Sequence, residues 1–172
     1  MPDATVADLL RTAAREIDRL DAELLLADVL GRQRAWLFAH DTETVPAPCA
    51  DSFAARVGRR AAGEPCALIR GTQEFWTLSL EVSADTLVPR ADTELLVELA
   101  LQIPAADSRA LSVLDAGTGS GAIAAALAAE RPRWHVFACD VSDDALRVAA
   151  RNCPRVPLFR ADWLQSIAPA SF

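Results

Sequence analysis

The sequence predicts an α/β fold in which an N-terminal helical bundle precedes an incomplete doubly wound, Rossmann-like sheet. Apolar residues recur at helical spacing through the first third of the chain, and short apolar strands alternate with helices over residues 111–160. Alternating strands and helices are typical of a parallel sheet with crossover connections. We therefore expect a helical domain at 1–63, a β-hairpin linker at 64–91 and the first half of an α/β domain at 92–172.

Four helices are expected in the N-terminal domain. The first carries Val6, Leu9, Leu10 and Ala13 on one face. The others are expected at 21–30, 34–39 and 49–62, with Gly31 and Gly63 in the places of helix-ending glycines. Periodic apolar residues of this kind usually form a core, so we expect packing rather than chemistry from this domain.

The linker and the α/β domain follow with a change in pattern. Residues 75–82 have the β-propensity of one strand of a hairpin, and a helix is expected at 92–101 with Asp92 or Thr93 as its cap. Strands are expected at 111–115, 134–139 and 156–159, and helices at 122–130 and 142–151. Three strands are about half of a doubly wound sheet. We expect further strands beyond Phe172 and an unpaired, association-prone edge on the third strand.

Composition limits the classes of partner. The chain has 172 residues, 52% apolar and 24% charged, with a net charge of −7, and all of its basic residues are arginines. This is a globular composition, and the acidic surplus disfavours direct binding to nucleic acid phosphates. The N-terminus lacks the pattern of a signal peptide, and the four cysteines form no C-x-x-C pair. We expect a cytoplasmic protein with no membrane contact and no metal site.

Residues 115–121, Asp-Ala-Gly-Thr-Gly-Ser-Gly, lie between a predicted strand and a predicted helix and are the strongest functional signal. Glycines let a ligand approach the backbone closely, and the N-terminus of the following helix presents free N–H groups to it. Two alternatives are a tight turn that binds nothing and a dinucleotide site, because Gly117, Gly119 and Ala122 fit the G-x-G-x-x-G/A pattern.

Two features favour S-adenosylmethionine over a dinucleotide. Gly121 follows Gly119 by two residues rather than three, and Asp115 would repel a pyrophosphate but attract a zwitterionic methionine group. The residues expected to bind this cofactor are therefore Asp115, Gly117, Thr118, Gly119, Ser120 and Gly121.

Two further positions fit the nucleoside part of such a cofactor. Asp140 ends the second strand, where a carboxylate can accept both ribose hydroxyls of either NAD or S-adenosylmethionine. Its alternative role is that of a solvated aspartate that caps the next helix. Asp162 and Trp163 follow the third strand and are expected at the adenine, unless the indole is simply at the edge of the core.

The chain resembles the release factor glutamine methyltransferases, bacterial enzymes that methylate the glutamine of the Gly-Gly-Gln motif in peptide chain release factors. The resemblance rests on residues 73–78 (Gln-Glu-Phe-Trp-Thr-Leu), on residues 87–94 (Leu-Val-Pro-Arg-Ala-Asp-Thr-Glu) and on the glycine segment. It implies a protein methyltransferase of translation termination whose helical domain docks class 1 release factors. It also implies that Phe75, Pro89 and Arg90 lie near the mouth of the site.

Two departures from the family pattern concern single residues. Ala91 stands where the family has a proline, and the chain contains no tyrosine. The family's catalytic Asn-Pro-Pro-Tyr motif, which would orient the glutamine amide, is also absent, so no catalytic residue is assigned within these residues. We therefore expect residues 1–172 alone to bind the cofactor weakly or not at all, to associate, and to transfer no methyl group.

Two other functional hypotheses remain open at this point. In the first, the chain is a non-catalytic module that binds a release factor. In the second, it is a related methyltransferase that acts on another protein or on a nucleic acid. The acidic net charge disfavours the nucleic acid substrate.

Overall fold

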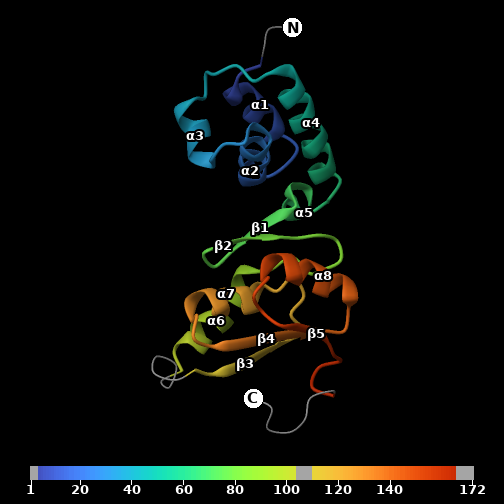
Figure 1. The fold of residues 1–172 in the computed structure, drawn as a ribbon. Helices are drawn as coiled ribbons and strands as arrows, with labels where there is room; N and C mark the ends of the chain where they lie inside the picture. The colour runs from blue at the N-terminus through green and yellow to red at the C-terminus, as the bar shows by residue number, and fades with distance from the viewer. Residues whose placement is uncertain (1–3, 104–109, 166–172) are drawn as a thin grey trace. The chain divides into compact units, whose positions relative to one another are not determined.

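The computed structural model describes residues 4–103 and 110–165. The chain divides into two compact units, Met1–Arg70 and Gly71–Phe172. Within the described residues, the first unit is built from helices, with one isolated β-bridge between Thr5 and Thr44, and the second combines helices with a hairpin and a parallel sheet (Figure 1). The predicted fold class, a helical bundle followed by an incomplete α/β sheet, is confirmed.

The helices of the first unit are α1 (Val6–Ala13), α2 (Arg19–Leu30), α3 (Arg34–Ala39), α4 (Ala47–Ala61) and α5 (Cys66–Arg70). Thr5 caps α1 through a reciprocal pair of hydrogen bonds with Asp8, and Gly31 ends α2 in the left-handed conformation, as its position predicted. Helix α5 was not predicted and lies in the segment expected to be the linker. Its five residues are too few to show a helical period.

Helix α2 is the centre of the first unit's core. Leu25 and Leu26 are fully buried, and they pack in one cluster with Val6, Leu37 and Phe53 from the neighbouring helices. This confirms that the periodic apolar residues of this unit form a core.

Ion pairs surround this core at the ends of the helices. Arg60 of α4 donates to Asp21 of α2 at 2.6 Å. Glu23 is only 5% exposed, and Arg19 donates to it at 2.9 Å, so this nearly buried carboxylate has a charged partner.

The second unit begins with a hairpin of β1 (Thr72–Phe75) and β2 (Leu78–Glu81). The prediction of one strand over 75–82 is wrong, because the chain turns at Trp76, whose φ is 56°. Neither turn position is a glycine or asparagine, so the usual signal of a tight turn is missing. Carboxylates hold the turn instead: the Trp76 backbone N–H donates to Glu94 at 2.8 Å, and its indole N–H donates to Glu130 at 2.7 Å.

The sheet contains β3 (Ser112–Ala116), β4 (His135–Asp140) and β5 (Leu158–Arg160), paired in parallel in the order β3-β4-β5. The strands confirm the three predicted ones with small shifts of their ends. Since β4 is central, β3 as well as β5 is an edge strand within the described residues. The sequence had pointed to an open edge on the third strand only.

Three helices belong to the second unit, namely α6 (Glu94–Leu101), α7 (Ala122–Glu130) and α8 (Asp143–Asn152). Ser142 caps α8 by accepting a hydrogen bond from the Ala145 amide. A 3-10 turn at Ala91–Thr93 precedes α6, and the helix begins without a side-chain cap, so neither residue predicted to cap it does so.

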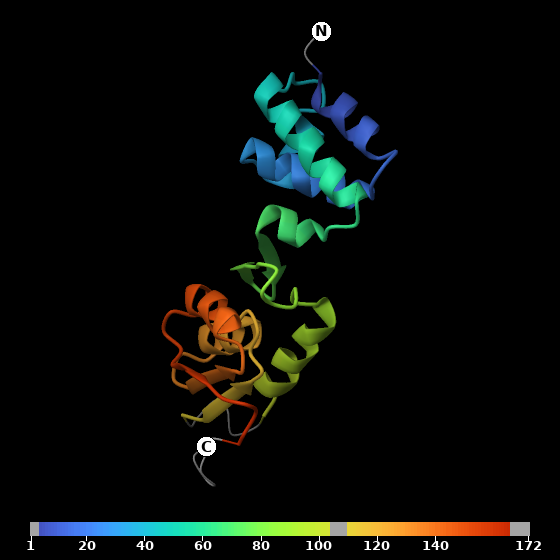
Figure 2. The ribbon, with the colours of Figure 1, turned by 90° about the vertical axis from the view of Figure 1, so that its right-hand side faces the viewer.

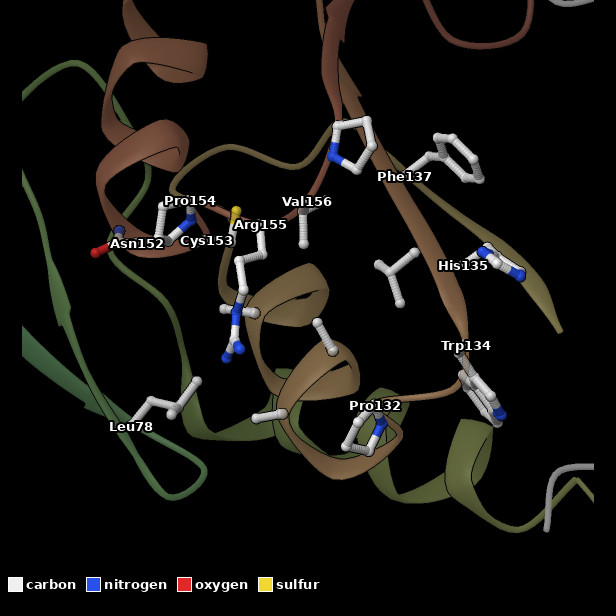
Figure 3. A pocket seen from close by; sticks show the side chains of 15 residues that line it. Leu78, Pro132, Trp134, His135, Phe137, Asn152, Cys153, Pro154, Arg155 and Val156 are labelled. Carbon is white, nitrogen blue, oxygen red and sulfur yellow. The ribbon is translucent and has the colours of Figure 1, made fainter. Parts of the chain in front are cut away.

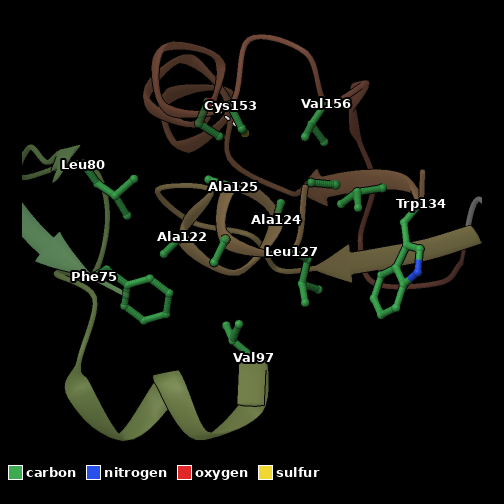
Figure 4. Packing of buried hydrophobic residues seen from close by; sticks show 14 residues of the cluster. Phe75, Leu80, Val97, Ala122, Ala124, Ala125, Leu127, Trp134, Cys153 and Val156 are labelled. Atoms are coloured by element: carbon green, nitrogen blue, oxygen red, sulfur yellow. Dashed lines mark hydrogen bonds between the residues drawn. The ribbon is translucent and has the colours of Figure 1, made fainter. Parts of the chain in front are cut away.

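All three helices lie on the same side of the sheet in Figures 1 and 2. Val97 of α6, Ala124 of α7 and Val136 of β4 pack there with Phe75 of the hairpin (Figure 4). Small side chains on α7 allow the neighbouring elements to come close to its backbone. No helix among the described residues covers the other face of the sheet, where Phe137 points away from α7 (Figure 3).

The core of the first unit yields a stability prediction. Leu25→Ala removes a fully buried side chain and should lower the free energy of unfolding of this unit by about 2–5 kcal/mol. Leu20→Ala is the matched control on the same helix, because Leu20 is 46% exposed; its effect should stay below about 1 kcal/mol. Amide hydrogen exchange of α2 measures both. Equal effects of the two variants would show that the core is misassigned.

Candidate functional site

The glycine loop lies where the sequence predicted it, after β3 and before α7, at the carboxyl end of the parallel strands. Gly117, Gly119 and Gly121 have φ angles of 76°, 55° and 82°. These are left-handed conformations that side chains other than glycine adopt at a cost, so this loop needs its glycines.

The three glycines face different surroundings. A β-carbon built on Gly119 would meet no atom within 4 Å, and one built on Gly117 would meet only the Trp163 ring at 3.9 Å. A β-carbon on Gly121 would lie 3.0 Å from the Cys153 sulfur and 3.2 Å from the Ala149 α-carbon. Gly119 therefore faces open space, Gly117 faces the Trp163 ring, and Gly121 permits close packing against α8.

The neighbouring strand β4 holds the start of the loop. The backbone N–H groups of Gly117 and Thr118 both donate to the Cys139 carbonyl at 2.9 Å. The next residue along β4 is Asp140, whose Oδ2 accepts a hydrogen bond from the Gly119 amide at 2.9 Å and whose Oδ1 accepts one from Ser142 at 3.0 Å.

Asp140 thus lies in direct contact with the loop, at the end of β4. Its carboxylate makes one local bond to the start of α8 and one to the loop, and the helix cap itself is Ser142. An ionised carboxylate offers about four acceptor positions, so capacity for two more hydrogen bonds remains. The predicted hydrogen bonds from ribose hydroxyls to Asp140 are therefore compatible with its present contacts, and they stay a prediction.

Asp115 is turned toward the loop's own polar groups. Its Oδ2 accepts hydrogen bonds from the Thr118 hydroxyl at 2.6 Å and from the Ala124 amide at 3.1 Å. Burial raises the pKa of Asp115, the charge of Asp140 raises it further, and the two hydrogen bonds lower it. Within the described residues, Asp115 braces the loop and the first turn of α7.

Trp163 follows β5 along the chain, and its ring lies beside the glycine loop. Its φ is 50°, its side chain is 67% exposed, and its ring faces Gly117. Asp162 accepts a hydrogen bond from the Gln165 side chain at 3.0 Å. The predicted contact of both residues with an adenine stays a prediction.

The three residues predicted near the mouth of the site have different surroundings. Phe75 is 1% exposed and packs in the core of the second unit, so its side chain contributes to packing. Pro89 is half-buried and Arg90 is exposed, just before the 3-10 turn. The structure describes no contact that links these residues to the glycine loop, and their proximity to a substrate stays a prediction.

Sequence analysis missed Asn152, which contacts the loop. This residue ends α8, and its side-chain amide donates to the Ser120 carbonyl at 2.8 Å. A lone asparagine in the last turn of a helix carries no functional signal in a single sequence. Only the packing of α8 against the loop identifies it.

A pocket of about 540 Å³ lies elsewhere in the second unit (Figure 3). Its wall includes His135 at the start of β4 and Pro157 just before β5, and thus marks the amino ends of the strands. The glycine loop and Asp140 lie at the carboxyl ends. Neither Asp140 nor any of residues 115–121 lines the pocket, although Asn152 and Cys153, which contact the loop, do. Ligands of open α/β sheets bind at the carboxyl ends of the strands.

Two features are absent from residues 4–103 and 110–165. No helix in these ranges has the length and apolar character needed to cross a membrane. No group of three or more His, Cys, Asp or Glu side chains there is arranged to hold a metal ion.

Comparisons with known proteins match both units. Residues 4–71 match the family described as PrmC N-terminal domain, and residues 113–172 match the family described as methyltransferase domain. A release factor glutamine methyltransferase of Xylella fastidiosa (strain 9a5c) is 46% identical over 170 residues, which are 95% of this chain and 61% of that protein.

Two further relatives carry the same name. That of Coxiella burnetii is 42% identical over 161 residues, 91% of this chain and 58% of the relative. That of Escherichia coli (strain K12) is 42% identical over 166 residues, 92% of this chain and 58% of the relative. The chain spans about three-fifths of the length of these relatives.

The buried carboxyl of Asp115 gives a pH prediction. A raised native pKa means that the folded protein binds this proton more tightly than the unfolded chain. The stability that Asp115 contributes is therefore greatest at low pH and falls as pH rises through the native pKa. Asp115→Asn keeps an oxygen that accepts from Thr118 and Ala124 but has no charge to bury. Its stability relative to the parent should rise between about pH 4 and pH 7.

Urea unfolding at several pH values measures this difference. Asp115→Ala is the control, because it removes the acceptor and should be less stable than the parent throughout the range. A stability difference between Asp115→Asn and the parent that does not change with pH would contradict the assignment.

Proposed function

We propose, from the premise that the chain belongs to the release factor glutamine methyltransferase family, that its second unit binds S-adenosylmethionine for methylation of a release factor glutamine. The observation that supports the proposal is the hydrogen bond from the Gly119 amide to Asp140 at the carboxyl ends of the strands. It joins the loop that is predicted to bind the methionine part to the carboxylate that is predicted to bind the ribose. The family relationship supports the choice of cofactor.

The residues at the carboxyl ends of the strands fit such a cofactor. The open space at Gly119 gives the methionine part room to approach the backbone. Asp140 retains acceptor capacity for the ribose hydroxyls, and the exposed Trp163 ring offers an apolar face for the adenine. When bound, S-adenosylmethionine supplies a methyl group on a sulfonium sulfur, which is electrophilic.

The same structure distinguishes the roles of residues that the motif groups together. Gly121 lets the loop pack on α8, and its surroundings support the proposal that Gly117 and Gly119, rather than Gly121, face the ligand. Asp115 holds Thr118 and the start of α7 in place. We propose that Asp115 positions the cradle, and that Asp140 makes the charged contact with the cofactor.

The relatives support the choice of a release factor as the substrate. The named relatives are release factor glutamine methyltransferases, and the PrmC N-terminal domain match covers the helical unit. We propose that this unit takes part in docking a class 1 peptide release factor, and that the protein works in the cytoplasm, where such factors act. A glutamine amide nitrogen is a poor nucleophile, so catalysis depends on holding it in line with the methyl group.

The first test is cofactor choice. Calorimetric titration of the full-length protein with S-adenosylhomocysteine should give binding heat, whereas residues 1–172 alone should bind it weakly or not at all, and titration with NAD should give none. Asp140→Ala should weaken S-adenosylhomocysteine binding by at least about tenfold, because a lost hydrogen bond to a charged group costs about 1.5–3 kcal/mol. Far-UV circular dichroism should show that the variant remains folded.

Asp143→Ala is the matched control for charge. Asp143 lies in the first turn of α8 and pairs with Arg160 at 3.0 Å, away from the loop contacts. Its removal should change the affinity by less than about twofold. Tighter binding of NAD, or equal losses in the two variants, would contradict the proposal.

The second test concerns methyl transfer. Asn152 is the only asparagine in the sequence and is followed by Cys153, so the motif expected to orient the substrate amide does not occur in residues 1–172. Binding the methyl donor alone does not stabilise the transition state. Incubation of the chain with labelled S-adenosylmethionine and a bacterial release factor should leave the Gly-Gly-Gln glutamine unlabelled. A relative of full length is the positive control, and labelling by the chain at a similar rate would show that the catalytic groups lie within these residues.

A further inference from the structure

The end of the glycine loop packs against the last turn of α8. Gly121 approaches this turn so closely that a β-carbon on it would lie 3.0 Å from the Cys153 sulfur and 3.2 Å from the Ala149 α-carbon. Ser120, just before it, is 3% exposed. The backbone of the loop therefore rests on α8 with no room for an added methyl group.

The Asn152 side chain links this part of the loop to the hairpin. Its Nδ2 donates to the Ser120 carbonyl at 2.8 Å and to the Glu81 carbonyl at 2.9 Å. Its Oδ1 accepts a hydrogen bond from the Glu81 amide at 2.7 Å. A carboxamide has two donor hydrogens and one oxygen, so both ends of this side chain are engaged.

We propose that Asn152 is a positioning residue whose carboxamide fixes the glycine loop to strand β2, so that the cofactor geometry of the loop depends on the hairpin. The inference deepens the proposed function, because it takes the loop to be the cofactor cradle. Asn152 acts through the Ser120 carbonyl and is not assigned any contact with the cofactor or the reacting atoms.

The physical reason lies in the freedom of the loop. Three glycines in left-handed conformations leave the backbone with many alternatives when it is unrestrained. Strand β4 restrains the first part of the loop, through the Cys139 carbonyl and the Asp140 carboxylate. At Ser120 the restraint comes from Asn152. Without that donor, the carbonyl of a buried residue loses its hydrogen bond, and the loop gains by moving.

Two substitutions separate positioning of the loop from anchoring of the hairpin. Asn152→Ala removes all three hydrogen bonds. Asn152→Asp has nearly the same shape and keeps an oxygen for the Glu81 amide, but it places a second oxygen against the Ser120 carbonyl. The charged side chains beside this position are those of Glu81 and Arg151, which pair with each other at 2.6 Å.

The readouts are amide hydrogen exchange at Gly119 and Glu81 in the free chain, and the affinity of the full-length protein for S-adenosylhomocysteine. Both variants should speed exchange of the Gly119 amide and weaken the affinity by about fivefold or more. The Glu81 amide should lose protection in Asn152→Ala and keep most of it in Asn152→Asp. A residue that merely anchors the hairpin would not change exchange at Gly119, whose own partner is Asp140.

Arg151→Gln is the matched control. It lies on the same turn of α8 and removes the exposed ion pair to Glu81, but it leaves the Asn152 amide intact. Gly119 exchange and the affinity should both stay within about twofold of the parent.

The proposal is overturned if Gly119 exchanges at the parent rate in the folded Asn152→Ala or Asn152→Asp variant. Should Asn152→Ala fail to fold, the nearly isosteric Asn152→Asp decides by itself. Failure of the parent to bind S-adenosylhomocysteine would overturn the proposed cofactor. The exchange at Gly119 would still decide whether Asn152 controls the loop.

Discussion

The parallel register of β3 and β4 is the constraint on which the rest of the second unit depends. It pairs Ala116 with Cys139, so the chain leaving β3 meets the carbonyl of Cys139 at once. That single oxygen accepts two backbone N–H groups of the loop, and Asp140, one residue further, reaches the Gly119 amide. A slip of one residue would turn the Asp140 side chain to the other face of the sheet and abolish these contacts together.

Two carboxylates share this small region, and their surroundings give them different tasks. Asp115 is largely buried, its pKa is raised, and its two bonds go to groups of the loop and α7. Asp140 ends its strand at the loop's rim with acceptor capacity to spare. Charge repulsion between them adds to the cost of ionising Asp115. This difference supports the proposal that Asp115 holds the loop and that Asp140 meets the hydroxyl groups of the cofactor.

Features encoded by adjacent residues could be predicted from the sequence, and features made by distant residues could not. The alternation of strands and helices identified the sheet, and the spacing of Gly117, Gly119 and Gly121 identified the loop, because both are local patterns. The turn at Trp76 was missed because its left-handed residue is not glycine, and its partners Glu94 and Glu130 are remote in sequence. Asn152 was missed for the same reason, since only folding brings it to Ser120.

The hairpin is held at both of its ends by hydrogen bonds to the rest of the second unit. At the turn, a positive φ at Trp76 costs about 1–3 kcal/mol, and hydrogen bonds to two carboxylates offset that cost only while α6 and α7 are in place. At the other end, Glu81 is bound by Asn152, which also binds the loop. The hairpin, the helices and the glycine loop therefore restrain one another. If Asn152 has the role proposed for it, a displacement of the hairpin changes the loop through the hydrogen bonds of its carboxamide, and the loop conformation depends on the hairpin as well as on the glycines.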